Sequence, residues 1–583
     1  MPARPAPAFM WRVGCALSIC AFGPSPGLAP HRLTSHQGAM TGPMPFALHY
    51  VGDGYSTDAK LMGRQAVGKS LFRAVARRWP SGDVYGFGRS AARTMMDQLQ
   101  REGFTGRLVW REQGSTSPPE GFPGVVYHPG PIPVALAHDR NREGIGAYSL
   151  LGVTHTLSSL GAMDSLGDLA GAPFQPWDAL ICTSAAAVVL VRSLMAERRD
   201  WLAEHYGATR FAEIELPVIP LGVDVAGLAR SPADIAAARE ALALDSDEVV
   251  FLFAGRLSFH AKANPAPLYL ALERASAGRR LVCIEAGQFH NEAIAESYRD
   301  AQRTLAPSVR FLHAEGSDPS AYRNAWSAAD VFVSISDNIQ ETFGITPVEA
   351  MASGLPVVVS DWNGYRDTVR DGQDGYRIPV VTPPPGGGID LALRHALMLD
   401  SYDRYIGQYS MATAVDLQVL ARRLAELADS SDLRARMGAS GRVRALAEYD
   451  WSVILGRYQA LAGELDRLRA TAPERSHPWP MRPDPATLFG HFPTRNLSAE
   501  WMVSAPAGRE SALEDVLRLR MTSYVIDPVR LPPDMIREIY TLAQARPGRL
   551  GDLMAAAGGG GRSRVRALLW LAKLGLVDLR PPG

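Results

Sequence analysis

The 583-residue sequence is poor in cysteine and contains no long apolar run. Of its four cysteines, Cys182 and Cys283 lie in short apolar stretches, so we expect core thiols rather than disulfide partners or metal ligands. This sparse usage suits a reducing compartment. No stretch of about 18 apolar residues occurs, and we therefore expect no transmembrane segment.

The sequence also lacks net charge. Sixty Lys and Arg balance sixty Asp and Glu, which gives a formal net charge of zero. A neutral balance gives no support for a protein that holds nucleic acid by bulk charge, so no nucleic-acid partner is expected. The 46% share of hydrophobic residues is that of a globular protein, and the length predicts roughly two to four domains.

The N-terminal residues resemble a targeting signal only loosely. Arg4 and Arg12 precede a short apolar stretch, residues 13–22, but prolines follow where a cleavage site would lie. We interpret residues 1–43 as a disordered extension that arises from a start codon assigned too early.

Two successive series of short apolar runs alternate with helical patterns. The first occupies residues 44–225 and the second residues 226–470. This alternation predicts parallel sheets covered by helices, and hence an α/β fold of two doubly wound, Rossmann-like domains facing a cleft. Residues 471–529 are expected to be a linker or extension. Residues 530–583 predict a small helical module with a winged-helix outline.

Individual strands are predicted from their apolar runs. The first series predicts strands at residues 46–51, 83–87, 107–109, 125–127, 134–137, 150–154, 179–183 and 215–219. The second series predicts strands at residues 249–254, 281–285, 309–313, 331–335 and 356–360.

The most informative stretch carries two glutamates eight positions apart. Glu341 falls in a loop after the strand expected at 331–335, and Glu349 falls in a helix that starts near Gly344. Eight positions on a helical path make a little over two turns, so both carboxylates can line one site. Gly344 provides a helix start without a side chain, where backbone N–H groups can face a phosphate.

A second motif places two cations after a buried strand. The strand at 249–254 ends in Gly-Arg-Leu, and Lys262 follows Arg256 by six positions. Two fixed cations can stabilise the charge that builds on a leaving diphosphate. The alternatives are a salt bridge at the strand end for Arg256 and a plain surface position for Lys262.

These motifs resemble the hallmark of the retaining glycosyltransferases of family 4, which adopt the GT-B fold. The two glutamates match its Glu-x7-Glu pattern, and Gly354-Leu-Pro-Val matches the Gly-x-Pro-Val that follows. The resemblance covers roughly residues 45–470 and says nothing about the remainder.

The resemblance implies a role for each site residue. Glu349 would bind the donor ribose, Glu341 would contact the donor sugar, and Arg256 and Lys262 would clamp the diphosphate without a metal or other cofactor. Backbone amides around Phe343, Gly344 and Ile345 would hold the sugar and diphosphate. The family also places a histidine where His155 lies, although a lone histidine can equally be structural. Asp367 stands where the family usually has a glutamate, which weakens any nucleotide role for it.

A competing motif occurs near the N-terminus. Residues 63–70 satisfy the Gly-x4-Gly-Lys-Ser pattern of a phosphate-binding loop. That loop should follow a strand directly, whereas here helix is expected from residue 64 onward. We favour a glycine-bearing loop of the first domain, with Gly63 near the donor phosphates and Lys69 on the surface.

The sequence thus predicts transfer of a hexosyl unit from a nucleoside-diphosphate sugar to an acceptor hydroxyl, with retention. The acceptor would be a glycan, a lipid or a small molecule. We expect a cytoplasmic location, which is compatible with peripheral contact with a membrane. Three alternatives stay open: a GT-B epimerase or phosphorylase, a silent sugar-nucleotide-binding protein, and a nucleotide-hydrolysing switch.

Overall fold

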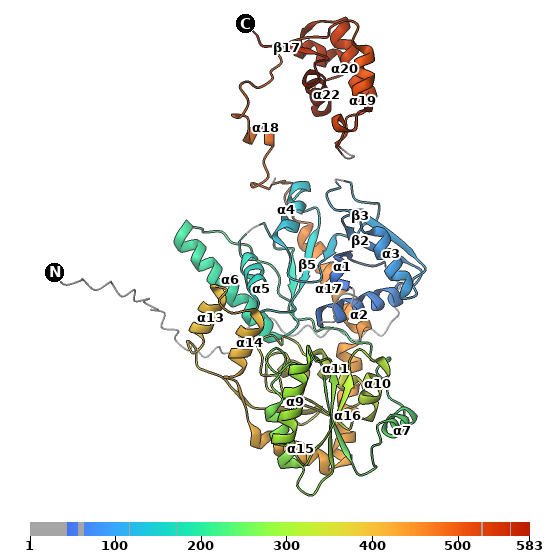
Figure 1. Cartoon of the computed structure of the whole chain (residues 1–583), viewed down its shortest axis with the longest axis vertical. Coiled ribbons are helices and arrows are strands. Elements are labelled where there is room, and N and C mark those ends of the chain that lie inside the picture. The colour runs from blue at the N-terminus through green and yellow to red at the C-terminus, as the bar shows by residue number, and fades with distance from the viewer. Residues whose placement is uncertain are drawn as a thin grey trace, which may run out of the picture. The chain divides into compact units, whose positions relative to one another are not determined.

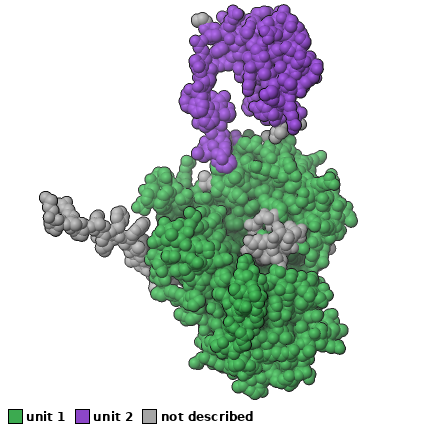
Figure 2. All heavy atoms as spheres, viewed as in Figure 1, with its two compact units in different colours: residues 1–474 green, residues 475–583 purple. Residues whose placement is uncertain are grey.

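The computed structural model describes residues 43–55, 63–115, 117–171, 173–477, 479–525, 529–559 and 561–582. The chain divides into two units, residues 1–474 and 475–583 (Figure 2). The extension expected at residues 1–43 lies, except for its last residue, outside the described residues. No helix in the described ranges is long and apolar enough to cross a membrane.

The first sheet has six parallel strands. They are β1 (Ala47–His49), β2 (Asp83–Gly88), β3 (Arg107–Glu112), β4 (Val125–Tyr127), β5 (Ser149–Val153) and β6 (Ala179–Ile181), in the order β3-β2-β1-β4-β5-β6. Its helices are α1 (Gly52–Tyr55), α2 (Gly63–Arg78), α3 (Ala92–Arg101), α4 (Val134–Glu143), α5 (Leu160–Asp168) and α6 (Ala185–Tyr206). Every residue of β4, β5 and β6 is buried, as a sheet covered on both faces requires.

The second sheet repeats this topology. Its strands are β7 (Val249–Ala254), β8 (Leu281–Gly287), β9 (Arg310–Glu315), β10 (Val331–Ser334), β11 (Val357–Ser360) and β12 (Gly375–Ile378), all parallel, in the order β12-β11-β10-β7-β8-β9. Its helices include α7 (Pro232–Ala241), α8 (Ala266–Ala275), α9 (Glu292–Leu305), α10 (Pro319–Ala328), α11 (Ile345–Ala352) and α12 (Tyr365–Thr368). Strand order reverses between β1 and β4 in one sheet and between β7 and β10 in the other. The predicted pair of Rossmann-like domains is therefore confirmed.

The chain then returns to the first domain. After β13 (Val380–Val381), α13 (Ile389–Ala396), α14 (Tyr402–Ser410), β14 (Ala414–Val415), α15 (Leu417–Asp429) and α16 (Ser431–Arg444), helix α17 (Trp451–Arg469) packs on the first sheet (Figure 1). The Tyr458 ring lies 6.1 Å from Phe46 and 5.7 Å from Tyr127, between ring centroids. Helix α17, which falls within the second domain predicted at residues 226–470, therefore completes the core of the first domain.

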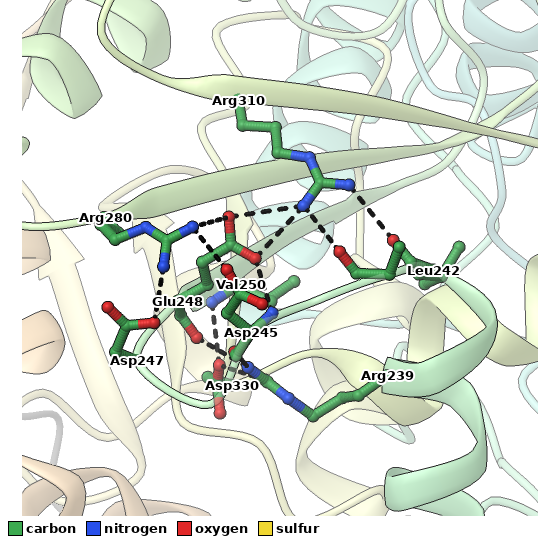
Figure 3. Close-up of polar contacts among 10 residues, drawn as sticks. Arg239, Leu242, Asp245, Asp247, Glu248, Val250, Arg280, Arg310 and Asp330 are labelled. Carbon is green, nitrogen blue, oxygen red and sulfur yellow. Dashed lines mark hydrogen bonds and ion pairs between the residues drawn. The ribbon is translucent and has the colours of Figure 1, made fainter.

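A network of charged side chains connects the amino ends of strands in the second sheet (Figure 3). The Glu248 side chain is only 5% exposed, and Arg280 and Arg310 donate to it at 3.4 and 3.2 Å. Asp330 accepts the backbone N–H of Val250 at 2.8 Å. These contacts tie neighbouring strands together at the edge where β7 begins, away from the carboxyl ends.

Two predicted strands of the first domain are wrong. Residues 134–137 begin α4, because their short apolar run continues into a helix that buries Leu136 and Ala137 on one side. Residues 215–219 pair with the first sheet only through isolated bridges, Ala179 to Glu215 and Cys182 to Val218, and form no named strand.

The second unit is a small module with its own core. Its elements are α18 (Pro485–Leu488), β15 (Met502–Ser504), α19 (Glu510–Arg518), α20 (Pro533–Ala545), β16 (Gly548–Arg549), α21 (Leu550–Ala556), α22 (Arg562–Lys573) and β17 (Asp578–Arg580). Strand β15 lies between β16 and β17 and is antiparallel to both. Val503 and Leu513 are buried in this core, so part of the segment expected as a linker belongs to the folded module.

Candidate functional site

The predicted donor residues lie where strand order reverses in the second sheet. Strand β7 ends at Ala254 and leads directly into Arg256, while neighbouring β10 ends at Ser334 and leads into the loop that carries Glu341. In open α/β sheets, ligands bind outside the carboxyl ends of strands at such a switch point. Topology alone therefore brings together two motifs that are about 85 residues apart in the sequence.

Lys262 and Glu341 form a direct ion pair. The Lys262 ammonium donates to the Glu341 carboxylate, and the two side chains are 23% and 10% exposed. The Asn363 side-chain amide donates to the backbone carbonyl of Glu341 and so fixes the loop from the other side. The pair joins the residue expected at the diphosphate to the residue expected at the sugar.

Arg256 is held by two oxygens. Its Nη2 donates to the Ala261 carbonyl at 2.9 Å and to the Gln340 Oε1 at 2.7 Å. The first contact anchors the guanidinium to the segment that carries Lys262, and the second anchors it beside Glu341. Both acceptors are neutral, so the Arg256 charge is not cancelled by either of them.

Glu349 lies in α11, within the electrostatic field of Lys262. Burial raises the pKa of Glu349 to about 7, and the positive charge of Lys262 partly opposes this rise. Burial raises the pKa of the Tyr322 hydroxyl, and the negative charge of Glu349 raises it further. The structure thus brings Glu341, Glu349 and Lys262 into one region, with Arg256 reaching it through Gln340.

Gly344 forms the turn that starts α11. Its φ of +82° lies in the left-handed region, and a Cβ there would sit 2.0 Å from the Tyr365 ring. Only glycine fits this position. The turn leaves the first backbone N–H groups of the helix, from Ile345 onward, without intrahelical acceptors, which suits an anion.

The Phe343 side chain packs in the hydrophobic core. It is 3% exposed, and its ring lies 6.3 Å from that of Tyr449. Only its backbone can serve a ligand, as the sequence motif implies.

His155 and Gly63 both lie in the first domain. The backbone carbonyl of His155, just after β5, accepts a hydrogen bond from the Thr342 hydroxyl at 2.7 Å. Gly63 is the first residue of α2, and the whole stretch 63–70 is helical. A helix cannot wrap a phosphate as a loop does, so this stretch is not a phosphate-binding loop, and Gly63 is not in a loop either.

The first sheet has a polar cluster at its own switch point, which sequence reasoning missed. His49 ends β1 and His128 follows β4, and their Nδ1 atoms lie 2.9 Å apart. Burial and nearby Arg89 lower the pKa of His49 to about 4, with Asp139 opposing, so its imidazole is neutral at physiological pH. Gln113 donates to Asp139 and accepts from Arg89. The sequence carries little signal for this cluster, because His49 falls inside the strand predicted at residues 46–51 and His128 is a single polar residue after the strand at 125–127.

Asp367 faces the first domain. Its Oδ2 accepts the backbone N–H of Ala185, the first residue of α6, at 2.6 Å. This contact ties Asp367 to the start of α6 in the first domain.

Two relatives of known name are glycosyltransferases. The chain is 31% identical over 175 residues to a phosphatidyl-myo-inositol mannosyltransferase of Mycobacterium tuberculosis, which covers 29% of this chain and 37% of that relative. It is 33% identical over 254 residues to a D-inositol 3-phosphate glycosyltransferase of Geodermatophilus obscurus, which covers 41% of this chain and 52% of that relative. The chain thus spans about half or less of the length of these relatives.

Solved structures and a family model complete the comparison. Sucrose-phosphate synthase from Thermosynechococcus elongatus aligns with a TM-score of 0.44 and 19% identity, over 73% of this chain and 100% of that one. A glycosyltransferase from Rickettsia africae aligns with a TM-score of 0.44 and 12% identity, over 72% and 97%. Residues 234–383, which carry all four charged residues of the candidate donor site, match the family model of the glycosyl transferases group 1.

Proposed function

We propose that the chain is a retaining glycosyltransferase, similar to those of family 4, that moves a hexosyl unit from a nucleoside-diphosphate sugar to an acceptor hydroxyl. One observation carries the proposal. Lys262, Glu341, Glu349 and Arg256 gather at the switch point of a sheet within the segment that matches the group 1 family. Carboxylates for sugar hydroxyls and cations for a diphosphate suit this class of donor.

We assign the chemistry as follows. Glu349 accepts hydrogen bonds from the ribose hydroxyls and Glu341 from the donor sugar, while the backbone N–H groups after Gly344 meet the diphosphate. Arg256 and Lys262 stabilise the negative charge that develops on the leaving group, in place of a metal. The bond from the anomeric carbon to the phosphate oxygen breaks, the acceptor oxygen bonds on the same face, and the departing phosphate takes the acceptor proton.

We place the acceptor at the first domain. The cluster around His49, His128 and Asp139 lies at the carboxyl ends of the first sheet. Loops from those ends contact residues 335–344, which carry Glu341 and which we call the donor loop. The neutral His49 imidazole, a carboxylate and an amide suit a polyhydroxylated acceptor. The exposed Arg89 suits a phosphate on it. The names of the two relatives contain phosphatidyl-myo-inositol and D-inositol 3-phosphate, so we propose an acceptor with an inositol that carries a phosphate group. Sugar nucleotides are typically cytosolic, and we place the reaction in the cytoplasm.

The test begins with a thermal-shift screen of uridine-, guanosine- and adenosine-diphosphate hexoses. The donor that binds is then incubated with free inositol, inositol phosphate or vesicles that contain phosphatidylinositol, and the products are analysed by mass spectrometry and NMR. We expect a glycosylated acceptor with the anomeric configuration of the donor, and no product with the Arg256→Ala variant. An altered sugar nucleotide without acceptor would identify an epimerase, binding without turnover a silent protein, and an inverted linkage would reject retention.

A further inference from the structure

Three consecutive residues of the donor loop have three different partners. Gln340 accepts from Arg256, and Glu341 pairs with Lys262, so both are held by the second domain. The third residue, Thr342, is held by the first domain instead. The loop is therefore anchored on both sides of the boundary between the two Rossmann-like domains.

Thr342 makes two hydrogen bonds to the first domain. Its hydroxyl donates to the His155 carbonyl at 2.7 Å, and its own carbonyl accepts from the Ser184 hydroxyl at 2.9 Å. Thr342 and Ser184 are both buried. Ser184 also accepts the N–H of Ala187 as the N-cap of α6, so its hydroxyl is fixed by the helix it caps. We name Thr342, His155 and Ser184 the interdomain clasp.

Asp367 strengthens the same boundary next to the clasp. Its carboxylate accepts the Ala185 N–H at the start of α6, which is 22 residues long. A negative charge is stabilised at the N-terminal end of a helix by the helix dipole. Arg444 donates to the Asp367 carbonyl at 2.8 Å and fixes Asp367 within the second domain.

We propose that Thr342 is a positioning residue that couples contact between the two domains to the placement of Glu341. Thr342 adjoins Glu341 in the chain, so the bonds that hold Thr342 limit where the Glu341 backbone can lie. The groups proposed to bind the nucleoside diphosphate all belong to the second domain: the Glu349, Arg256 and Lys262 side chains and the backbone N–H groups after Gly344. Nucleotide binding is therefore independent of the clasp, whereas sugar transfer depends on it.

The inference rests on the proposed function, and its test separates the two. Thr342→Val keeps the shape of the side chain but removes the hydroxyl, and Thr342→Ser keeps the hydroxyl. For each variant, calorimetry gives the Kd of the nucleoside diphosphate that wild type binds, and initial rates give kcat and KM for transfer. Thr413→Val is the matched control, because the Thr413 hydroxyl donates to the Tyr409 carbonyl, at 3.3 Å, within its own domain.

For Thr342→Val we expect a nucleotide Kd within twofold of wild type, a kcat at least tenfold lower, and a larger share of donor lost to hydrolysis. Thr342→Ser should restore kcat to within about threefold, and Thr413→Val should change neither quantity. An unchanged kcat in a folded Thr342→Val protein would overturn the inference. So would a Kd that weakens in parallel with kcat, because it would indicate local damage to the donor site. Failure of wild type to bind any sugar nucleotide would instead reject the proposed function.

Discussion

Lys262 and Glu341 are bonded to each other, although the proposed donor needs each of them for a different group. In the proposed complex, the diphosphate would compete with Glu341 for the Lys262 ammonium, and a sugar hydroxyl would compete with Lys262 for the Glu341 carboxylate. The pair thus keeps both charges satisfied in a partly buried place, where an unpaired charge is costly. Entry of the proposed donor would replace this ion pair with one contact from each of the two side chains to the donor.

This relationship predicts opposite effects of two substitutions on nucleotide binding. Glu341→Gln frees Lys262 for the diphosphate, so the nucleoside diphosphate without a sugar should bind as tightly as to wild type or up to about tenfold more tightly. Transfer should nevertheless fall about 100-fold, because the sugar loses its carboxylate partner. Calorimetry and initial rates measure the two effects. Lys262→Met should weaken the same nucleotide about tenfold, and equal weakening by both variants would contradict the competition.

Glu349 predicts an unusual pH dependence of stability. Its pKa is raised by burial to about 7 in the folded chain, above its ordinary 4.5, so folding disfavours the ionised form. The destabilisation is therefore fully present above pH 7 and is relieved as the pH falls towards 4.5. Glu349→Gln should raise the free energy of unfolding at pH 8 by on the order of 2 kcal/mol, and by little near pH 4.5. Denaturant titrations at both pH values measure this, and a loss of stability at pH 8 would show that the carboxylate is not strained by burial.

The same pKa predicts a pH dependence of donor binding. In the proposed role, the ionised Glu349 would accept hydrogen bonds from the ribose hydroxyls, so nucleotide affinity should fall as the pH drops below about 7. The affinity of Glu349→Gln should be lower at pH 8 and nearly flat between pH 6 and 8. A wild-type profile without a change near pH 7 would remove Glu349 from the nucleotide site.

Gly344 predicts a severe effect of a single methyl group. In Gly344→Ala, the added carbon would overlap the Tyr365 ring and the residue would keep a left-handed backbone, so we expect a loss of 3 kcal/mol or more, an order-of-magnitude figure, and no transfer. Gly354→Ala is the matched control, since Gly354 has a φ of +76° but open space around it. It should cost only about 1 kcal/mol. Similar melting temperatures for the two variants would argue against the contact with Tyr365.

The buried pair of Arg140 and Asp178 predicts a loss of stability without loss of the donor site. Both side chains are fully buried, 2.6 Å apart, and Asp178 also accepts the N–H of Leu150. Asp178→Asn leaves Arg140 without its counter-charge and should cost about 3 kcal/mol. Asp83→Asn, which breaks the exposed pair with Arg107, should cost less than about 1 kcal/mol. Thermal unfolding compares the two, and equal effects would contradict the role of burial.

The fold was predictable where the apolar runs are long and bounded by breakers. Residues 249–254 form a strand as predicted, because six consecutive apolar residues suit a sheet buried on both faces. Residues 134–137 were misread because a run of four apolar residues fits a helix and a strand equally well. Strand β15 could not be found from its three residues, since it forms only by pairing with β16 and β17 from far along the chain.

Within the candidate site, the sequence pattern indicated the charged residues of the second domain but not the polar cluster of the first. The donor residues are grouped in two short stretches, so local sequence already carries their pattern. His49 and His128 are 79 positions apart, and only the strand order places them together. The stretch 63–70 shows the opposite case, because it satisfies a phosphate-loop pattern but lies in a helix. Short patterns therefore carry information only together with the topology around them.

The return of α17 to the first domain has a consequence for synthesis of the chain. The aromatic core formed by Phe46, Tyr127 and Tyr458 cannot close until residue 458 has left the ribosome. The part of the first sheet that α17 covers therefore stays exposed to solvent while the entire second domain is synthesised. A chain that terminates before Trp451 would leave that surface of the sheet exposed permanently. The first domain is therefore a poor choice for expression on its own, although most of it is synthesised first.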